Sequence, residues 1–401
     1  MEVAQVGDTL KTKIAFVTNQ MVMGGIEKSL ITLLEKIPKE HFEVTVFLIS
    51  PGGELLDKIP SEVKVKYLFR NENTTIGRMW GYTIRGKFIT AFKTGLYTFL
   101  LRRGAKSIFH ENMYYSQMLP KEKYVYDLAI SYYIPTSLSV LYVMNNMKAK
   151  KRAAWIHGDV TEYGQSLPKY RDIYEKYNYI FGVSLYTVQK FGEIFPHLKE
   201  KTSLFYNILD KGKMKSLANK NKSYADKFDG IRLLTIGRLE FEKGQDLIPK
   251  VLSKLVRDGY DVRWYCIGDG LIRSRMEGEI QEYGLNENLI LLGNQENPYP
   301  YIKDCDIYIQ PSRHEAYCIT VAEARVFNKP IITTNTGASE QITNDETGLV
   351  INFDENEMYN AIKQLLEDKT LRKKFKKNLS TEKVDTTNEI EKLYKIIEEI
   401  S

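Results

Sequence analysis

Short runs of aliphatic and β-branched residues recur along the chain, and segments with the apolar spacing of helices separate them. In the first example, the run at 13–19 is followed by Gly24 and Gly25 and then by helically spaced apolar residues up to Ile37. A strand, a glycine turn and a helix in this order are typical of the first unit of a parallel α/β sheet. The other runs in the first half that predict strands are 42–50, 63–68, 127–133, 153–158 and 179–185.

The second half repeats this alternation and predicts a second sheet. Because the runs in both halves are rich in Val, Ile and Leu, we expect an α/β fold of two Rossmann-like parallel sheets, each covered by helices on both faces. Open parallel sheets bind ligands at the carboxyl ends of their strands, so a central cleft between the two domains is the expected place of a site. The runs that predict strands here are 231–237, 262–268, 289–293, 306–312 and 330–335, and helices are expected up to Gly259, near 316–327, at 357–368 and at 388–400.

A polar, lysine-rich segment at 208–230 separates the two halves. Its shortage of large aliphatic side chains is typical of a linker or a mobile surface segment. We therefore predict an N-terminal domain at 1–207 and a C-terminal domain, linker included, at 208–385, with a last helix at about 386–401 that can pack back on the N-terminal domain. A length of 401 residues agrees with this division, since a domain holds about 150 residues.

Charge is distributed unevenly between the halves. The net charge of +6 is small for a nucleic-acid-binding protein. Residues 1–210 contain 28 basic and 20 acidic side chains, whereas residues 211–401 contain 29 and 31. The two halves are therefore expected to meet different partners.

The sequence predicts neither a secretory signal nor a membrane-spanning segment. The N-terminus is acidic in part, and no run of 18 apolar residues occurs. Cys266, Cys305 and Cys318 lie in apolar runs without the spacing of metal ligands, so we expect them to be reduced and buried, outside any disulfide or zinc site. We expect a cytoplasmic protein, either free or peripheral on the inner face of the cell membrane.

Two carboxylates and a helix start follow the strand expected at 306–312. Glu315 and Glu323 are eight residues apart, which on one helix would separate them by about 12 Å, beyond the roughly 5 to 9.5 Å of a glycosidase pair. The spacing suits a long ligand held at both ends, with a diphosphate at the helix N-terminus between them. Equally, Glu315 could cap the helix and Glu323 could be solvated. The backbone NH groups concerned belong to Tyr317, Cys318, Ile319 and Thr320.

A second candidate segment, 235–244, follows the first strand expected in the second half. Gly237 permits a tight exit from the strand. Arg238 and Lys243 lie in the following loop and at the expected helix start, where positive charge and the helix dipole favour phosphate. Taken alone this signal is weak, because basic residues at a helix start are usually solvated.

Together the two segments resemble the retaining nucleotide-sugar glycosyltransferases of family 4, which have the GT-B fold. The resemblance implies that Arg238 and Lys243 bind the donor diphosphate beside Gly237, that Glu323 holds the ribose hydroxyls, and that Glu315 lies at the donor sugar near its reacting face. Further segments that match in the family's order are 267–270 (IGDG), 291–294 (LLGN), 304–324, 329–342 and 344–350.

The first half matches the family in two shorter segments. MGGIEKSL at 23–30 resembles its glycine loop, which implies that Gly24 and Gly25 lie near the donor phosphates. WIHGD at 155–159 resembles the segment with the active-site histidine, which makes His157 the candidate. Cys318 departs from the family pattern, since many members have Gly or Pro there. A backbone NH contact to phosphate would tolerate this change.

The resemblance implies transfer of a hexosyl or hexosaminyl group, with retention, from a nucleoside-diphosphate sugar to a saccharide hydroxyl. UDP is the commonest donor carrier, and a lipid-linked acceptor in bacterial surface-polysaccharide or cell-envelope glycan synthesis fits the basic first half. No metal cofactor is required if Arg238 and Lys243 neutralise the diphosphate, and Asp304 and Asp306 are read as a helix end passing into a strand. The alternatives are a nucleotide-sugar epimerase of the same fold and a catalytically silent, glycan-binding partner subunit.

One stretch of the first half is rich in cations and aromatic rings. Residues 73–110 contain seven Lys and Arg side chains and no Asp or Glu. This composition suits the surface of an anionic membrane, where each cation contributes about 1 kcal/mol. It equally suits a basic helix pair packed on the sheet. Single-stranded nucleic acid is also bound by such patterns, but the sugar-transfer motifs argue against it.

Overall fold

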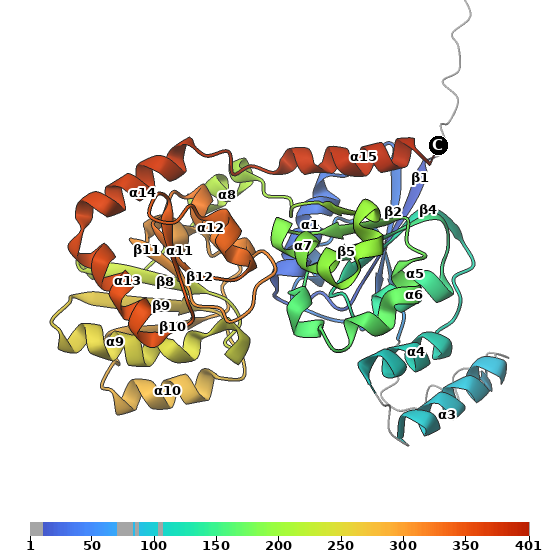
Figure 1. The fold of residues 1–401 in the computed structure, drawn as a ribbon, viewed down its shortest axis with the longest axis horizontal. Coiled ribbons are helices and arrows are strands. Elements are labelled where there is room, and N and C mark those ends of the chain that lie inside the picture. The colour runs from blue at the N-terminus through green and yellow to red at the C-terminus, as the bar shows by residue number, and fades with distance from the viewer. Residues whose placement is uncertain (1–10, 70–82, 85–87, 103–106, 401) are drawn as a thin grey trace, which may run out of the picture. The chain divides into compact units, whose positions relative to one another are not determined.

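A computed structural model describes residues 11–69, 83–84, 88–102 and 107–400. Its contacts divide the chain into two units. One consists of Met1–Tyr206 together with Asn388–Ser401, and the other of Asn207–Thr387. Each unit is a parallel sheet with helices against it (Figure 1). The predicted α/β class with two Rossmann-like sheets is confirmed.

The first unit contains a seven-stranded sheet in the order β3-β2-β1-β4-β5-β6-β7, and every pair of neighbours is parallel. The chain order reverses between β1 and β4, which makes their carboxyl ends a place for ligands. The strands are β1 (Thr12–Thr18), β2 (Phe42–Leu48), β3 (Lys64–Tyr67), β4 (Val125–Tyr133), β5 (Lys148–Ile156), β6 (Tyr179–Gly182) and β7 (Thr202–Leu204). The α-helices are α1 (Gly25–Lys36), α3 (Phe88–Arg102), α4 (Ile108–Met118), α5 (Leu138–Asn146), α6 (Arg171–Tyr174), α7 (Leu185–Ile194) and α15 (Ile390–Glu398).

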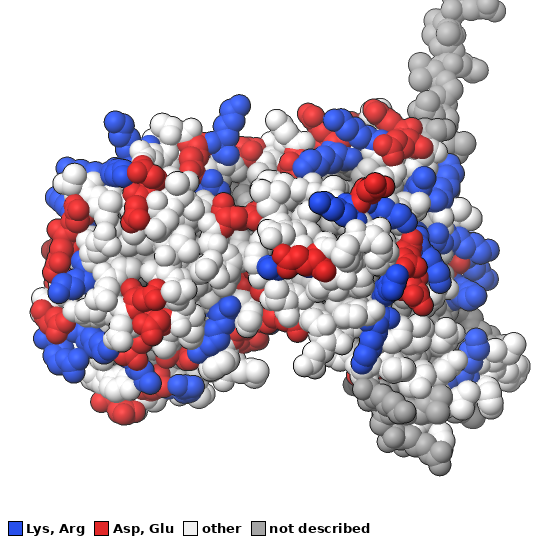
Figure 2. All heavy atoms as spheres, viewed as in Figure 1, with Lys and Arg blue, Asp and Glu red and all other residues white. Residues whose placement is uncertain are grey.

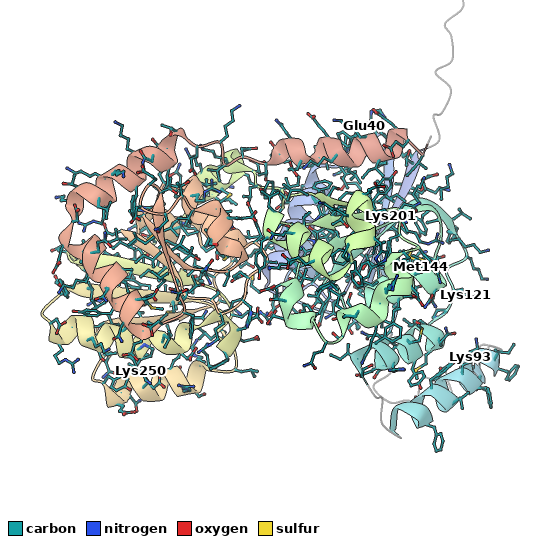
Figure 3. The ribbon with its side chains drawn as sticks, viewed as in Figure 1. Glu40, Lys93, Lys121, Met144, Lys201 and Lys250 are labelled. Atoms are coloured by element: carbon teal, nitrogen blue, oxygen red, sulfur yellow. The ribbon has the colours of Figure 1, made fainter. Side chains whose placement is uncertain are left out.

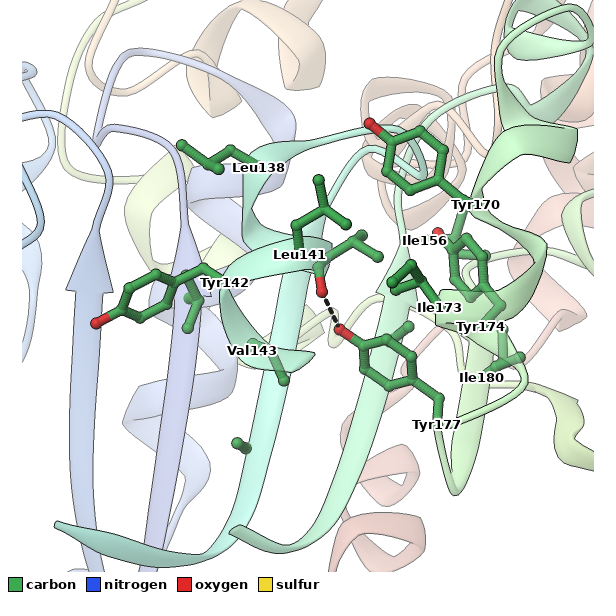
Figure 4. Packing of buried hydrophobic residues seen from close by; sticks show 14 of the residues in the cluster. Leu138, Leu141, Tyr142, Val143, Ile156, Tyr170, Ile173, Tyr174, Tyr177 and Ile180 are labelled. Carbon is green, nitrogen blue, oxygen red and sulfur yellow. Dashed lines mark hydrogen bonds between the residues drawn. The ribbon is translucent and has the colours of Figure 1, made fainter. Parts of the chain in front are cut away.

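Buried tyrosines organise the core of this unit around the start of α5 (Figure 4). The hydroxyl of Tyr170 donates to the carbonyl of Thr136 at 2.8 Å, and that of Tyr177 donates to the carbonyl of Val140 at 2.8 Å. A buried phenol needs such a partner, because an unpaired hydroxyl in a core costs free energy. Burial also raises the pKa of Tyr170 to about 12, so this network stays protonated at neutral pH.

The C-terminal helix α15 packs on the first unit. The ring of Tyr394 stacks on that of Phe42 at 5.9 Å, and its hydroxyl donates to the carbonyl of Lys36 at 3.3 Å. Leu393, Ile396 and Ile397 are buried, as expected for the apolar face of an amphipathic helix.

The second unit contains a six-stranded parallel sheet in the order β10-β9-β8-β11-β12-β13. Here the chain order reverses between β8 and β11, so the loops after these two strands lie side by side. The strands are β8 (Ile231–Ile236), β9 (Val262–Ile267), β10 (Leu289–Gly293), β11 (Ile307–Gln310), β12 (Ile331–Thr334) and β13 (Gly348–Ile351). The α-helices are α8 (Lys211–Ala218), α9 (Ile248–Arg257), α10 (Arg273–Glu282), α11 (Tyr299–Asp304), α12 (Ile319–Val326), α13 (Glu355–Glu367) and α14 (Lys369–Thr381).

The segment at 208–230 is more ordered than a simple linker. It contains α8, and its far end is held to the sheet by the carboxylate of Asp226. This group accepts hydrogen bonds from Tyr265 and from Arg232, which outweigh its partial burial and lower its pKa to about 2. All three cysteines are buried and free. Among the described residues, no helix combines the length and the apolar character that crossing a bilayer requires.

Candidate functional site

The loops after β8 and β11 pack backbone against backbone. Gly244 has φ of 72°, and a Cβ placed on it would lie 1.8 Å from the carbonyl oxygen of Pro311. Only glycine satisfies both constraints. Gly237, by contrast, has ordinary room for a Cβ, and the close approach at this strand end falls on Gly268, whose Cβ would lie 2.0 Å from the Gly237 carbonyl oxygen. The loops therefore meet because of Gly244.

This approach brings Lys243 and Glu315 together at the strand ends. The Nζ of Lys243 lies 3.0 Å from the Oε1 of Glu315 and 3.3 Å from that of Glu242. The side chains of Lys243 and Glu315 are only 17% and 9% exposed. Burial alone would lower the pKa of Lys243, but the charges of Glu315 and Glu242 outweigh it and raise that pKa above its usual value. Lys243 is therefore a fixed cation at this edge.

A chain of buried hydrogen bonds anchors Glu315 to the sheet. The hydroxyl of Ser312 donates to Glu315 at 2.7 Å and accepts from the amide of Gln310 at 2.9 Å. The amide oxygen of Gln310 in turn accepts from Tyr308 at 2.7 Å and from the hydroxyl of Thr320 at 3.2 Å. Every link is satisfied, so Glu315 has little freedom to move.

Helix α12 begins later than the sequence suggested, at Ile319, so Glu315 and Glu323 do not share a helix. Glu315 pairs with Lys243 and Ser312 instead of capping the helix, which contradicts the capping interpretation. Glu323 lies on α12, is 4% exposed and accepts from the hydroxyl of Tyr299 at 3.3 Å, so the solvated interpretation is also wrong.

Cys318 precedes α12 with φ of 64°, the left-handed region that favours glycine. This conformation explains why glycine would be suited to the position, and the buried thiol is accommodated by contact with the hydroxyl of Thr320 at 3.3 Å. The amide of Gln341 donates to the carbonyls of Tyr317 and Cys318. Gln341 thus fixes the backbone of the turn that precedes α12.

Arg238 differs from Lys243 in its surroundings. Its side chain is 52% exposed and pairs with Glu240 at 3.0 Å. The amide of the buried Gln245 donates to the carbonyls of Gly237 and Arg238, which fixes the backbone of this turn. Arg238 is therefore a solvated cation on a rigid turn.

Sequence reasoning missed the ion pair that ties the two loops together. Arg313 donates to both oxygens of Asp246, at 2.7 and 2.8 Å, and its guanidinium lies 3.5 Å from the ring centroid of Phe241 and 4.0 Å from that of Phe353. Such a two-pronged, stacked arginine is strongly oriented. We name Arg313 and Asp246 the loop clamp. Its spacing of 67 residues left no local signal.

The first-half candidates follow strands of the first sheet: Gly24 and Gly25 lie between β1 and α1, and His157 comes directly after β5. Gly24 precedes α1, and a Cβ there would lie 2.3 Å from the Oε2 of Glu27, so a side chain at this position would require the Glu27 carboxylate to move. Ser29 contacts the hydroxyl of Tyr132 at 2.8 Å, and the ring of Tyr132 lies 4.1 Å from that of His157. Tyr132 thus links α1, which begins at Gly25, with His157.

The Nε2 atom of His157 is buried without a hydrogen-bond partner among the described residues. Burial lowers the pKa of His157 to about 3, so the imidazole is neutral at pH 7. A neutral ring with a free nitrogen can donate to or accept from a ligand hydroxyl.

This pKa gives a testable pH dependence. Below pH 6.5 an unfolded His157 takes up a proton that the folded one refuses until about pH 3, so stability falls as pH drops through that window. We expect the free energy of unfolding to be about 1 to 2 kcal/mol lower at pH 5 than at pH 7.5. Urea unfolding of the unchanged protein and of His157→Gln measures this difference. If the free energy of unfolding depends on pH equally in both proteins, the low pKa of His157 is contradicted.

Asp304 and Asp306 bind protein groups. Asp304 accepts from Ser223 at 2.6 Å, and Asp306 accepts from the backbone NH of Arg232 at 2.9 Å. Throughout the described ranges, no group of three or more His, Cys, Asp and Glu side chains is arranged to hold a metal ion.

Residues 218–381, which include both loops and the clamp, match the family model described as glycosyl transferases group 1. This match covers 164 of the 401 residues, which is less than half of the chain. Among curated proteins, the chain is 27% identical over 249 residues to the N-acetylgalactosamine-N,N'-diacetylbacillosaminyl-diphospho-undecaprenol 4-alpha-N-acetylgalactosaminyltransferase of Campylobacter jejuni, covering 61% of this chain and 62% of that protein. It is 26% identical over 212 residues to protein CapJ of Staphylococcus aureus, covering 51% of each. The chain thus matches less than two thirds of the length of these relatives.

Solved structures resemble nearly the whole chain. Anabaena Alr3699/HepE in complex with UDP and glucose has a TM-score of 0.70 at 15% identity, covering 97% of this chain and 100% of that one. WaaG, a glycosyltransferase involved in lipopolysaccharide biosynthesis, has a TM-score of 0.64 at 15% identity, covering 96% and 99%. The chain has the GT-B fold.

Proposed function

We propose that this protein is a retaining glycosyltransferase that moves a sugar from a nucleoside-diphosphate sugar to a hydroxyl of a saccharide acceptor. The observation that carries the proposal is the buried Lys243 beside Glu315, at the reversal point of the second sheet and inside the residues that match the group 1 model. A fixed cation at the carboxyl ends of parallel strands suits a departing diphosphate.

Different residues of the second unit bind different parts of the donor. Lys243, the solvated Arg238 and the NH groups of 317–320 stabilise the charge that grows on the diphosphate as the glycosidic bond breaks. With two cations available, no metal ion is needed in this scheme. Glu323 binds the ribose hydroxyls, and Glu315, held by Ser312, lies at the donor sugar.

The first unit supplies the remaining contacts. The NH groups of Gly24 and Gly25 approach the donor phosphates, and the neutral His157 exchanges a hydrogen bond with a sugar hydroxyl through its free Nε2. Because its pKa is far below 7, His157 acts as a hydrogen-bonding group and not as a cation.

Donor and acceptor are proposed from the relatives. UDP and UDP-glucose are bound in structures of Anabaena Alr3699/HepE, so we propose a UDP-sugar. The name of the C. jejuni relative describes transfer of N-acetylgalactosamine to a diphospho-undecaprenol-linked saccharide, so we propose a lipid-linked acceptor and a hexosyl or hexosaminyl group, in bacterial envelope glycan synthesis.

A two-stage screen tests the function. Thermal shift against UDP-, GDP- and ADP-sugars identifies the donor, and mass spectrometry of reactions with lipid-linked saccharides identifies the product. We expect one UDP-sugar to raise the melting temperature and to add one sugar to the acceptor. Isomerisation of labelled donor without acceptor would instead indicate an epimerase, and calorimetry that detects no binding of any donor would indicate a silent partner subunit.

A further inference from the structure

Helix α3 exposes an unusual row of large apolar side chains. Phe88, Ile89, Phe92, Leu96 and Phe99 are between 42% and 75% exposed. A soluble surface rarely exposes so many adjacent apolar groups without a partner. We propose that this row, named the α3 face, inserts into the headgroup region of an anionic phospholipid bilayer. The inference does not depend on sugar transfer.

The row is one face of the helix. Successive helical residues turn by about 100°, which places all five side chains within an arc of roughly 100°. Ala91 and Thr94 lie on the other side and are buried, and Tyr97 stacks on Tyr114 of α4 at 5.5 Å. Helix α4 therefore supports α3 from behind and leaves its apolar row uncovered, so α3 is not simply half of a helix pair buried on the sheet.

Charge selects the partner. Lys93 lies on α3 beside the row (Figure 3). In the sequence, residues 73–110 contain seven cations and no acid, and 73–82, 85–87 and 103–106 of them lie outside the described residues. In Figure 2 the visible part of this region, at lower right, shows uncoloured side chains beside blue ones. A second copy of the same face would bring like charges together, whereas anionic headgroups complement them.

The length of α3 indicates whether this helix lies in the membrane surface or crosses the membrane. Helix α3 has 15 residues and is therefore about 22 Å long, shorter than the roughly 30 Å hydrocarbon core. A short helix with an apolar face, a cationic flank and its remaining face packed on protein fits the interfacial position.

Flotation with phospholipid vesicles tests the proposal. The full chain is mixed, without nucleotide sugar, with vesicles of phosphatidylglycerol and phosphatidylcholine in equal amounts, and with vesicles of phosphatidylcholine alone. We expect binding to the anionic vesicles that weakens as salt is added. Phe92→Ser combined with Phe99→Ser is expected to reduce vesicle partitioning by about a hundredfold, and Lys93→Gln by about fivefold.

Matched controls remove exposed groups elsewhere. Leu185→Ser with Leu271→Ser takes away two exposed apolar side chains, and Lys250→Gln takes away a lysine on α9 (Figure 3). These variants should float like the unchanged protein, and all should keep its melting temperature. Wild-type partitioning by the double phenylalanine variant overturns the proposal, as does an equal loss in the controls. A third outcome also overturns the proposal. If the phenylalanine changes convert a dimer to a monomer and leave vesicle binding unaltered, the α3 face joins two copies of the chain.

Discussion

Replacing Lys243 with methionine is expected to lower the rate of sugar transfer by about two to three orders of magnitude. Its ammonium group is the buried, fixed cation at the ends of β8 and β11, and groups of this kind act where charge develops in the transition state. The rate is measured with the donor found by the screen. Arg238→Ala should also slow transfer, but less, because solvent already screens its exposed guanidinium.

Loss of Lys243 also leaves Glu315 without its cation, so a stability control is needed. The double variant Lys243→Met with Glu315→Gln removes both charges and should unfold close to the unchanged protein. We expect it to remain as slow in transfer as Lys243→Met, which separates chemistry from folding. Lys250→Met, a change at an α9 lysine, should alter neither property. Near-normal rates of sugar transfer in both Lys243→Met and Arg238→Ala would contradict the proposed function.

Replacing Asp246 with alanine is expected to destabilise the second unit by about 3 kcal/mol and to weaken donor binding. The change leaves the guanidinium of Arg313 between two aromatic rings without its main charge partner. Removing one partner of a largely buried ion pair costs far more stability than replacing both partners by apolar side chains. The clamp also joins the loops that place Lys243 against Glu315. Chemical denaturation and calorimetry with the donor measure the two effects.

The two effects of the clamp are separable. Asp246→Leu with Arg313→Leu removes both charges, so most of the stability should return. If donor affinity recovers together with stability, packing alone positions the two loops and the ion pair is not needed to orient them. If affinity stays low while stability recovers, the clamp is a positioning device. Unchanged stability in Asp246→Ala would contradict the interpretation of the contact.

Much of the fold was predictable because buried parallel strands are continuous apolar runs. The runs at 231–237 and 289–293 coincide with β8 and β10 to within a residue. Two short edge strands were not found: β7 has three residues and was missed, and β13, with four, was not assigned. The first residues of β5 were also missed, because the charged sequence from Lys148 to Arg152 still pairs with β4.

The candidate site was predictable as a set of residues and not as a set of contacts. Lys243, Glu315 and the 317–320 turn were singled out, and the two loops that hold them lie side by side. That Lys243 and Glu315 pair with each other depends on the backbone approach at Gly244, which no local pattern specifies. The roles proposed for these residues stay predictions until donor binding is measured.

The return of α15 to the first unit sets an order of events during synthesis. The second unit is one continuous stretch, Asn207–Thr387, and its sheet can be completed before the last residues leave the ribosome. The first unit, although translated first, waits for Tyr394 to cover Phe42 and the end of α1. Its final packing is therefore a late step, and a chain cut after residue 387 would keep all of the second unit while the first unit would lack the helix that covers Phe42.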